Sequence, residues 1–182
     1  MPHVQQSHTA SVSSNGSDVS QRHTISILVE NKFGAFHRIA GLFAAKGYNI
    51  DSITVGPTEE EDISRMTIVT RGDDQVIEQI TKQLNNLIDT IKVVDLTFES
   101  FVERELVLIK VASTPETRSE IMQIGEIFRA KVVDISPKTL TLEATGGQQK
   151  VDAIITMLKP FGIRELARTG RVALRREFQG EV

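Results

Sequence analysis

The sequence predicts an α+β fold built from two copies of one βαββαβ unit. Short segments of alternating apolar and polar residues, bounded by turn residues, are typical of strands with one buried face. Between them, apolar residues recur at the three-to-four-residue spacing of amphipathic helices. The motif Ile39-x-x-Leu-Phe-x-Ala-Lys46 also returns 85 residues later as Ile124-x-x-Ile-Phe-x-Ala-Lys131. Such internal repetition indicates a duplicated structural unit.

The first unit reads strand, helix, strand, strand, helix, strand. The helices are expected from Phe36 to the stop at Gly47, and from the cap at Asp73 through Ile88. The expected strands are 24–30, 50–55, 64–70 and the alternating stretch Val94, Leu96 and Phe98. This order gives an antiparallel sheet with both helices on one face, the ferredoxin-like arrangement.

The second unit repeats that order. Its expected elements are a strand at 105–112, a helix at 115–130, a hairpin of strands 132–136 and 139–144, a helix at 148–158 and a last strand within 163–174. The predicted organisation is therefore a tail at 1–22, a first domain at 23–98, a linker at 99–104, a second domain at 105–178 and a short tail at 179–182.

Composition excludes several classes of protein. The 182 residues carry a net charge of −3 and contain no cysteine, which excludes disulfides, thiol catalysis and cysteine metal sites. A basic footprint for nucleic acid and an apolar run long enough for a membrane helix are both absent from the sequence. Residues 1–22 are polar and rich in serine, so we expect a disordered tail. A cytoplasmic location is expected.

The two units differ where ligand chemistry would lie. Gly34 stands at the start of the first helix, whose N–H groups and dipole suit a carboxylate. Asn31 and Asn49 flank that helix, and their amide oxygens could accept from an ammonium group, with Ile50 as an apolar wall. These residues suit a small amino acid. They also fit a structural role in which Asn31 caps the helix and Gly34 ends a turn.

The second copy lacks this chemistry. At the same offset of 85 residues, Glu116 replaces Asn31, Ser119 replaces Gly34 and Asp134 replaces Asn49. Two carboxylates in place of two amides would repel a ligand carboxylate. The first copy is therefore the one expected to bind a ligand.

Five segments resemble a known family. They are 25–43 around Asn31-Lys-Phe-Gly34-Ala35, Gly47-Tyr48-Asn49-Ile50-Asp51, Ser64-Arg65-Met66-Thr67-Ile68, Val102-Glu103-Arg104-Glu105-Leu106 and Arg168-Thr169-Gly170-Arg171-Val172. The first resembles the amino-acid-binding ACT domain. The set, which spans about 23–177, resembles the regulatory small subunits of acetohydroxyacid synthase, also called acetolactate synthase.

The resemblance implies a regulatory subunit without catalytic residues or metal ligands of its own. Its partner would be a separate catalytic (large) subunit that carries thiamine diphosphate, Mg²⁺ and FAD. The small subunit would activate that enzyme, confer feedback inhibition by valine or another branched-chain amino acid, and form homodimers through its ACT domains. The implied effector residues are Asn31, Gly34, Ala35, Phe36, Asn49 and Ile50. His37 departs from the small polar residue more common in the family.

Other functions have weaker support in the sequence. The acidic run 59–62 fits a solvated hairpin tip better than a pair of catalytic carboxylates. An RNA-binding sheet would need exposed aromatic residues, whereas the chain has one tyrosine and no tryptophan. The basic stretch 164–176 is interpreted as a docking edge or a solvated face. The alternative function is a stand-alone ACT-domain sensor that regulates another enzyme or transcription, although no helix-turn-helix segment accompanies it.

Overall fold

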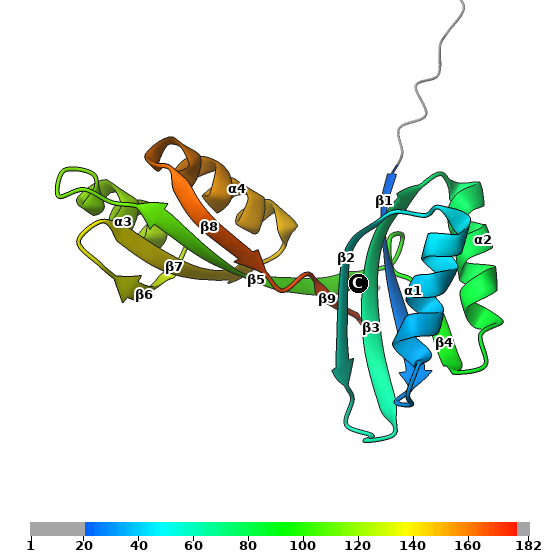
Figure 1. The fold of residues 1–182 in the computed structure, drawn as a ribbon. Helices are drawn as coiled ribbons and strands as arrows, with labels where there is room; N and C mark the ends of the chain where they lie inside the picture. Colours follow the sequence, from blue (N-terminus) through cyan, green and yellow to red (C-terminus); the bar gives the residue numbers. More distant parts are fainter. Residues whose placement is uncertain (1–20, 178–182) are drawn as a thin grey trace, which may run out of the picture.

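The computed structural model describes residues 21–177, which form two α+β domains joined by a two-stranded ribbon (Figure 1). The elements of the first domain are β1 (Gln21–Glu30), α1 (Ala35–Lys46), β2 (Ile50–Pro57), β3 (Ile63–Gly72), α2 (Asp74–Asn85) and β4 (Thr90–Asp95). Its sheet has the strand order β2-β3-β1-β4, and every pairing is antiparallel. The predicted βαββαβ unit is thereby confirmed.

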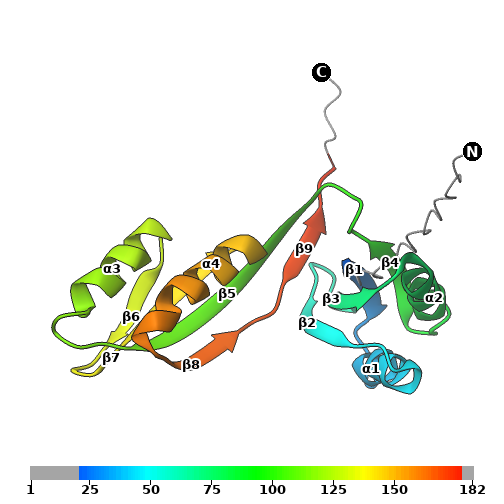
Figure 2. The ribbon, with the colours of Figure 1, turned by 90° about the horizontal axis from the view of Figure 1, so that it is seen from above.

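Alternate side chains of the central strands point toward the helices and form the core of this domain. Ile25, Ile27 and Val29 of β1 are fully buried and face the two helices. Phe43 of α1 and Leu84 of α2 close over them, so both helices cover one face of the sheet. Figure 2 shows α1 on the β2 side of the sheet and α2 on the β4 side.

The second domain repeats this architecture. Its elements are β5 (Phe101–Ala112), α3 (Arg118–Ile127), β6 (Lys131–Ile135), β7 (Thr139–Gly146), α4 (Gln148–Leu158), a 3₁₀ turn (Lys159–Phe161) and β8 (Ile163–Arg168). The strand order is β6-β7-β5-β8, and a separate apolar core lies between this sheet and α3 and α4. The predicted duplication is confirmed, and residues 148–158 form a helix with the expected bounds.

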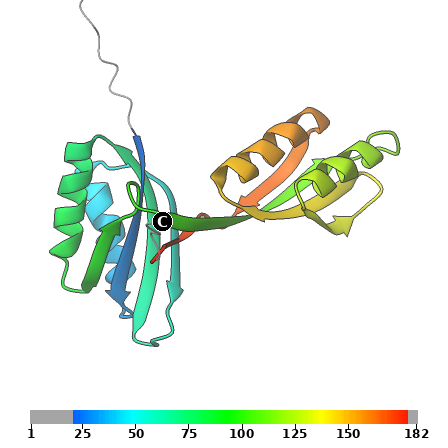
Figure 3. The ribbon, with the colours of Figure 1, turned by 180° about the vertical axis from the view of Figure 1, so that it is seen from behind.

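A ribbon connects the domains across the helix-free face of the first sheet (Figure 3). The first four residues of β5 pair antiparallel with β9 (Val172–Arg175), with Phe101 opposite Arg175 and Arg104 opposite Val172. The rest of β5 pairs with β7 and β8 in the second sheet. One continuous strand therefore belongs both to the ribbon and to the second domain.

Several expected boundaries differ from the structure. The fourth strand was expected to reach Phe98, but β4 ends at Asp95, because the Asp95 carboxylate accepts hydrogen bonds from the backbone N–H (2.9 Å) and the hydroxyl of Thr97 and turns the chain. Leu96 is buried just outside the strand, whereas Phe98 is 73% exposed and packs edge-on against His23.

The expected linker and tail also contain regular structure. Residues 101–104 of the expected linker 99–104 belong to β5, because β9 supplies them with a pairing partner. Gln21 and Arg22 of the expected tail 1–22 belong to β1, where they lie opposite Gly72 and Arg71. Residues 1–20 and 178–182, which include the rest of the expected N-terminal tail and the expected tail 179–182, lie outside the described residues. Among residues 21–177, no helix combines the length and apolarity that crossing a membrane requires.

Candidate functional site

Gly34 forms the N-cap of α1 in a left-handed backbone conformation, with φ = 86°. This conformation favours glycine, since a side chain there meets steric strain. No side chain caps the helix, so N–H groups of its first turn have no side-chain acceptor in the structure. The end of α1 thus offers N–H donors and the positive end of the helix dipole to an anion.

Arg38 adds a positive charge at the same place. A Cβ atom built on Gly34 would lie 3.0 Å from Arg38 Nη1, so the guanidinium group lies directly over the glycine. Arg38 is held there by the Asp89 carboxylate, and its side chain is 42% exposed. Sequence reasoning missed Arg38, although its position one helical turn after Gly34 could have indicated it.

Asn31 is anchored by the β2–β3 hairpin and does not cap the helix. Its amide nitrogen donates to the Glu61 carbonyl over 3.0 Å, and its backbone N–H donates to the Asp62 carbonyl over 2.6 Å. These bonds leave the Asn31 amide oxygen for another donor. Ala35 is buried under the first turn, and Phe36 is 50% exposed beside it. His37 is exposed on the helix surface.

The structure does not bring the whole predicted site together within one chain. Asn31, Gly34, Ala35 and Phe36 lie at the N-terminal end of α1, whereas Asn49 and Ile50 follow its C-terminal end. The helix has 12 residues and is therefore about 18 Å long. A small amino acid cannot contact Gly34 and Asn49 of the same chain.

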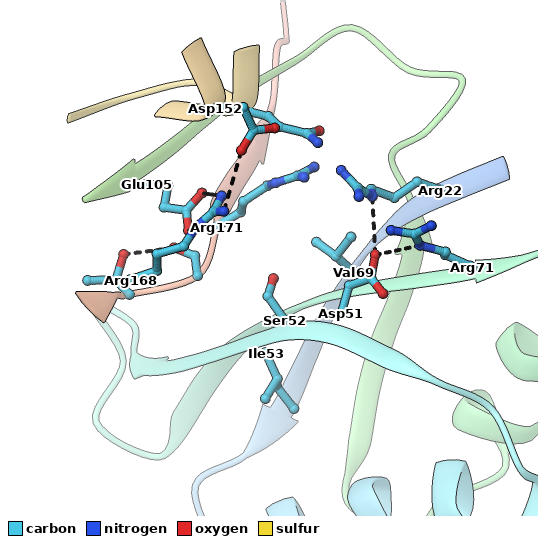
Figure 4. A pocket seen from close by; sticks show the side chains of 13 residues that line it. Arg22, Asp51, Ser52, Ile53, Val69, Arg71, Glu105, Asp152, Arg168 and Arg171 are labelled. Atoms are coloured by element: carbon cyan, nitrogen blue, oxygen red, sulfur yellow. Dashed lines mark hydrogen bonds and ion pairs between the residues drawn. The ribbon is translucent and has the colours of Figure 1, made fainter. Parts of the chain in front are cut away.

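Asn49 is linked by one hydrogen bond to a residue that lines the contact between the domains. Its amide nitrogen donates to Asp51 Oδ1 over 3.1 Å. Asp51 Oδ2 lies 2.9 Å from Arg71 Nε and 3.2 Å from Arg22 Nε (Figure 4). The carboxylate of Asp51 therefore joins β1, β2 and β3 next to the C-terminal end of α1.

A polar cleft of about 480 Å³ separates this cluster from the second domain. On the far wall, Arg168 binds both oxygens of Glu105 over 2.7 and 2.8 Å and lies 3.4 Å from Asp152. Figure 4 shows the two clusters facing each other across the cleft. Thr54 of β2 also donates to the backbone carbonyl of Arg171 over 2.7 Å, which fixes β2 to the segment before β9.

Comparison with known proteins assigns the family. A family model described as an acetohydroxyacid synthase small-subunit-like ACT domain matches residues 25–92, and one described as the small subunit of acetolactate synthase matches 104–177. The probable acetolactate synthase small subunit of Archaeoglobus fulgidus is 56% identical over 153 residues, which cover 84% of this chain and 96% of that protein. The chain belongs to the acetolactate synthase small-subunit family.

Two further relatives agree with this assignment. The acetolactate synthase small subunit of Aquifex aeolicus is 58% identical over 159 residues, or 86% of this chain and 82% of that protein. The crystal structure of the small subunit from Thermotoga maritima superposes with a TM-score of 0.78 at 45% identity, and the match covers 86% of this chain and 98% of that one. Both domains of the small-subunit fold are therefore present.

The ion pairs on the two walls of the cleft shift the pKa values of Asp51 and Arg168. Burial raises the pKa of the Asp51 carboxyl, but the hydrogen bond and charge of Arg71, helped by Arg22, outweigh burial and lower it. The hydrogen bonds to Glu105 raise the pKa of Arg168 against the effect of burial. Glu105 is 3% exposed, so Arg168 compensates a carboxylate that is almost removed from water.

The structure does not match the two domains at the constant offset of 85 residues that the sequence comparison used. Thr117, not Ser119, is the N-cap of α3, and Ser119 lies inside that helix. Asp134 lies within β6 and does not precede it as Asn49 precedes β2. The two N-caps, Gly34 and Thr117, are 83 residues apart, two fewer than 85, so α3 begins earlier relative to the shared helix motif than α1 does. The second copy still places no glycine at this helix N-cap.

Proposed function

We propose that this small subunit activates a separate catalytic subunit of acetolactate synthase and makes it sensitive to feedback inhibition by valine. The observation that carries the proposal is the position of Gly34 and Asn49 at opposite ends of α1. A ligand that needs both residues must take them from two chains. The site is thus complete only in a homodimer.

The edge strand β2 supplies the geometry for such a dimer. Among the described residues, β2 pairs with β3 alone, so its other edge is available to a second copy. A two-fold axis through the middle of β2 would join two sheets and set the two α1 helices antiparallel, because α1 lies on the β2 side (Figure 2). The Gly34 end of one helix then faces the Asn49 end of the other.

The two half-sites are complementary to a small aliphatic amino acid. One chain offers N–H groups at Gly34 and the guanidinium of Arg38 to the carboxylate. The other offers the amide oxygen of Asn49 to the ammonium group, since its amide nitrogen is occupied by Asp51. Phe36 and Ile50 supply apolar surface for a branched side chain, whereas Ala35 is buried beneath the helix end. Asn31 contributes its amide oxygen.

The same arrangement offers a route for regulation. Asn49 contacts Asp51, and Asp51 holds the wall of the cleft that faces the second domain. Valine that engages Asn49 would therefore bias the contact between the domains, and with it the surface presented to the catalytic subunit. In this proposal, thiamine diphosphate, Mg²⁺ and FAD belong to the catalytic chain. The alternative, a stand-alone sensor, predicts valine binding without an effect on acetolactate synthesis.

A complementation experiment tests the shared site. Gly34→Asp and Asn49→Asp chains with different affinity tags are mixed, the mixed dimer is isolated, and valine binding is measured by calorimetry. Each single variant alone should bind no valine. The mixed dimer should bind one valine, because one of its two sites receives Gly34 and Asn49 intact.

The matched control is a mixed dimer of the wild-type chain and the double variant Gly34→Asp/Asn49→Asp. It contains the same two substitutions, but each of its shared sites carries one of them, so it should bind no valine. One valine bound by this control and none by the first mixture would contradict a site shared between chains. Assay of acetolactate formation with the catalytic subunit then separates a regulatory subunit from a stand-alone sensor.

A further inference from the structure

A second pocket, distinct from the ends of α1, lies between β2 and the ribbon. It is a groove of about 370 Å³ between the C-terminal half of β2 and the β5–β9 ribbon, on the helix-free face of the first sheet. Apolar residues dominate its lining, and two side chains on the ribbon are strongly exposed: Val172 (57%) and Leu174 (58%). Exposed apolar residues that gather around one concave surface indicate a binding site.

Two arginines give this groove a specific charge. Among the described residues, Arg65 and Arg104 are the charged side chains that line it. Arg65 Nη1 donates to Ser26 Oγ over 3.1 Å, and Arg104 Nη1 donates to the Glu103 carbonyl over 2.7 Å. Both acceptors are neutral, and neither arginine forms an ion pair with any residue of 21–177.

The other arginines near the domain contact differ in this respect. Arg22 and Arg71 share the carboxylate of Asp51, and Arg168 binds Glu105, so each of these arginines has a carboxylate partner. In the groove, the two positive charges face apolar surface without a carboxylate between them. An anion with an apolar body would pair with the two arginines and cover the exposed apolar surface.

The register of the strands shows how such a ligand would lie. In the ribbon, Arg104 is directly opposite Val172, so their side chains share one face. In the sheet, Arg65 is directly opposite Gly56, and nothing lies within 4 Å of the place where a Cβ on Gly56 would stand. The missing side chain leaves room beside Arg65. The charged groups are therefore flanked by apolar side chains and by open space.

We propose that this groove binds a small aliphatic monocarboxylate that has no ammonium group. The carboxylate pairs with Arg65 and Arg104, and the hydrocarbon chain packs on Val102, Val172 and Leu174, which share one face of the ribbon with Arg104. An amino acid is disfavoured, because its ammonium group would face two guanidinium groups and find no carboxylate in the lining. The ligand class thus differs from that of the site at α1.

Three probes of similar size separate charge from shape. The acid 4-methylpentanoate, its amino derivative leucine and the neutral 4-methylpentan-1-ol are titrated into the full chain. Binding is followed by calorimetry and by the methyl resonances of Val102, Val172 and Leu174, which line the groove on the ribbon. We expect 4-methylpentanoate to shift these resonances, and leucine and the alcohol to bind there at least about tenfold more weakly.

Substitutions test the assignment on the surface of the chain. Val172→Glu places a carboxylate opposite Arg104 and should abolish binding of 4-methylpentanoate, and Arg104→Gln should weaken it about tenfold. The matched control is Val133→Glu, since Val133 is 50% exposed on β6, in the other domain. This control should bind the acid as the wild type does.

Three results would overturn the proposal. The first is groove resonances that respond to leucine as strongly as to 4-methylpentanoate. The second is unchanged affinity in Val172→Glu. The third is no binding of the acid to the wild type. If Val172→Glu then also changes the oligomeric state measured by light scattering, the groove is an interface between protein chains.

Discussion

Asn49 and Asp51 connect the end of α1 to the contact between the domains: the Asn49 amide donates to one carboxylate oxygen of Asp51, and the other oxygen binds Arg71 and Arg22. A side chain proposed to bind the effector is therefore one hydrogen bond away from the wall of the interdomain cleft. A substitution of either residue should therefore affect both the end of α1 and the interdomain cleft.

Asp51→Asn should lower the free energy of unfolding at neutral pH. It should also make that free energy fall less as the pH is lowered. The folded-state pKa of Asp51 is lowered, so its contribution is present above the unfolded pKa of about 3.9 and is lost as pH falls through the folded value. We expect a loss of about 1 kcal/mol at pH 7, and a smaller difference from the wild type at pH 3. Urea unfolding at both pH values measures this. Glu60→Gln on the exposed hairpin is the control and should show neither effect.

Gly34→Asp should abolish the valine response and leave the chain folded. The new carboxylate would occupy the place of the ligand carboxylate and pair with Arg38, whose Nη1 lies 3.0 Å from the added Cβ. Gly34→Asn imposes the same backbone strain, about 1 kcal/mol, without the charge. Circular dichroism checks the fold, and calorimetry checks valine binding. Equal valine affinity in Gly34→Asp and the wild type would exclude the assignment of this helix end.

Arg168→Met should destabilise the protein by about 2–3 kcal/mol, because it leaves the buried Glu105 carboxylate without its cation. The double variant Glu105→Leu/Arg168→Met should recover most of that loss, so the two substitutions should be coupled by about 1–3 kcal/mol. The comparison pair is Lys110–Glu165, whose Glu165 is 72% exposed; Lys110→Met should cost less than about 1 kcal/mol. Additive effects at positions 105 and 168 would contradict this interpretation.

Removal of residues 2–20 should leave the thermal midpoint and valine binding unchanged, because their serine-rich composition offers little apolar surface to bury. Removal of residues 2–22 should lower the midpoint, because Gln21 and Arg22 pair with β3 and Arg22 binds Asp51. The difference between the two truncated chains isolates these two residues. Identical midpoints for the two would show that the pairing contributes nothing.

The sequence was informative wherever local pattern decides structure. Residues 148–158 have regular apolar spacing after Gly147, and the helix has the expected bounds. The end of β4 was misplaced, because Asp95 turns the chain through its side chain while apolar alternation continues to Phe98. β9 was not separated from β8, because four residues carry little pattern of their own.

The candidate site shows the same division. The sequence predicted the candidate residues, and it predicted the helix that lies between Gly34 and Asn49. The position of the Arg38 guanidinium over Gly34 depends on Asp89, which is 51 residues away along the chain. The pair Glu105–Arg168 spans 63 residues, and its contact follows from the register of β5 and β8. Such pairings are set by tertiary structure.

The continuity of β5 gives the second domain a mechanical role. The 12 residues of this strand extend for about 40 Å, with one end clamped to β9 over the first sheet and the other inside the second sheet. The strand therefore acts as a lever whose fulcrum is the ribbon. A tilt of about 10° at the ribbon would carry the far end, ~26 Å away, by roughly 5 Å. Under the proposed regulation, a small rearrangement beside β2 would thus become a displacement of several ångströms at the far end of the second domain.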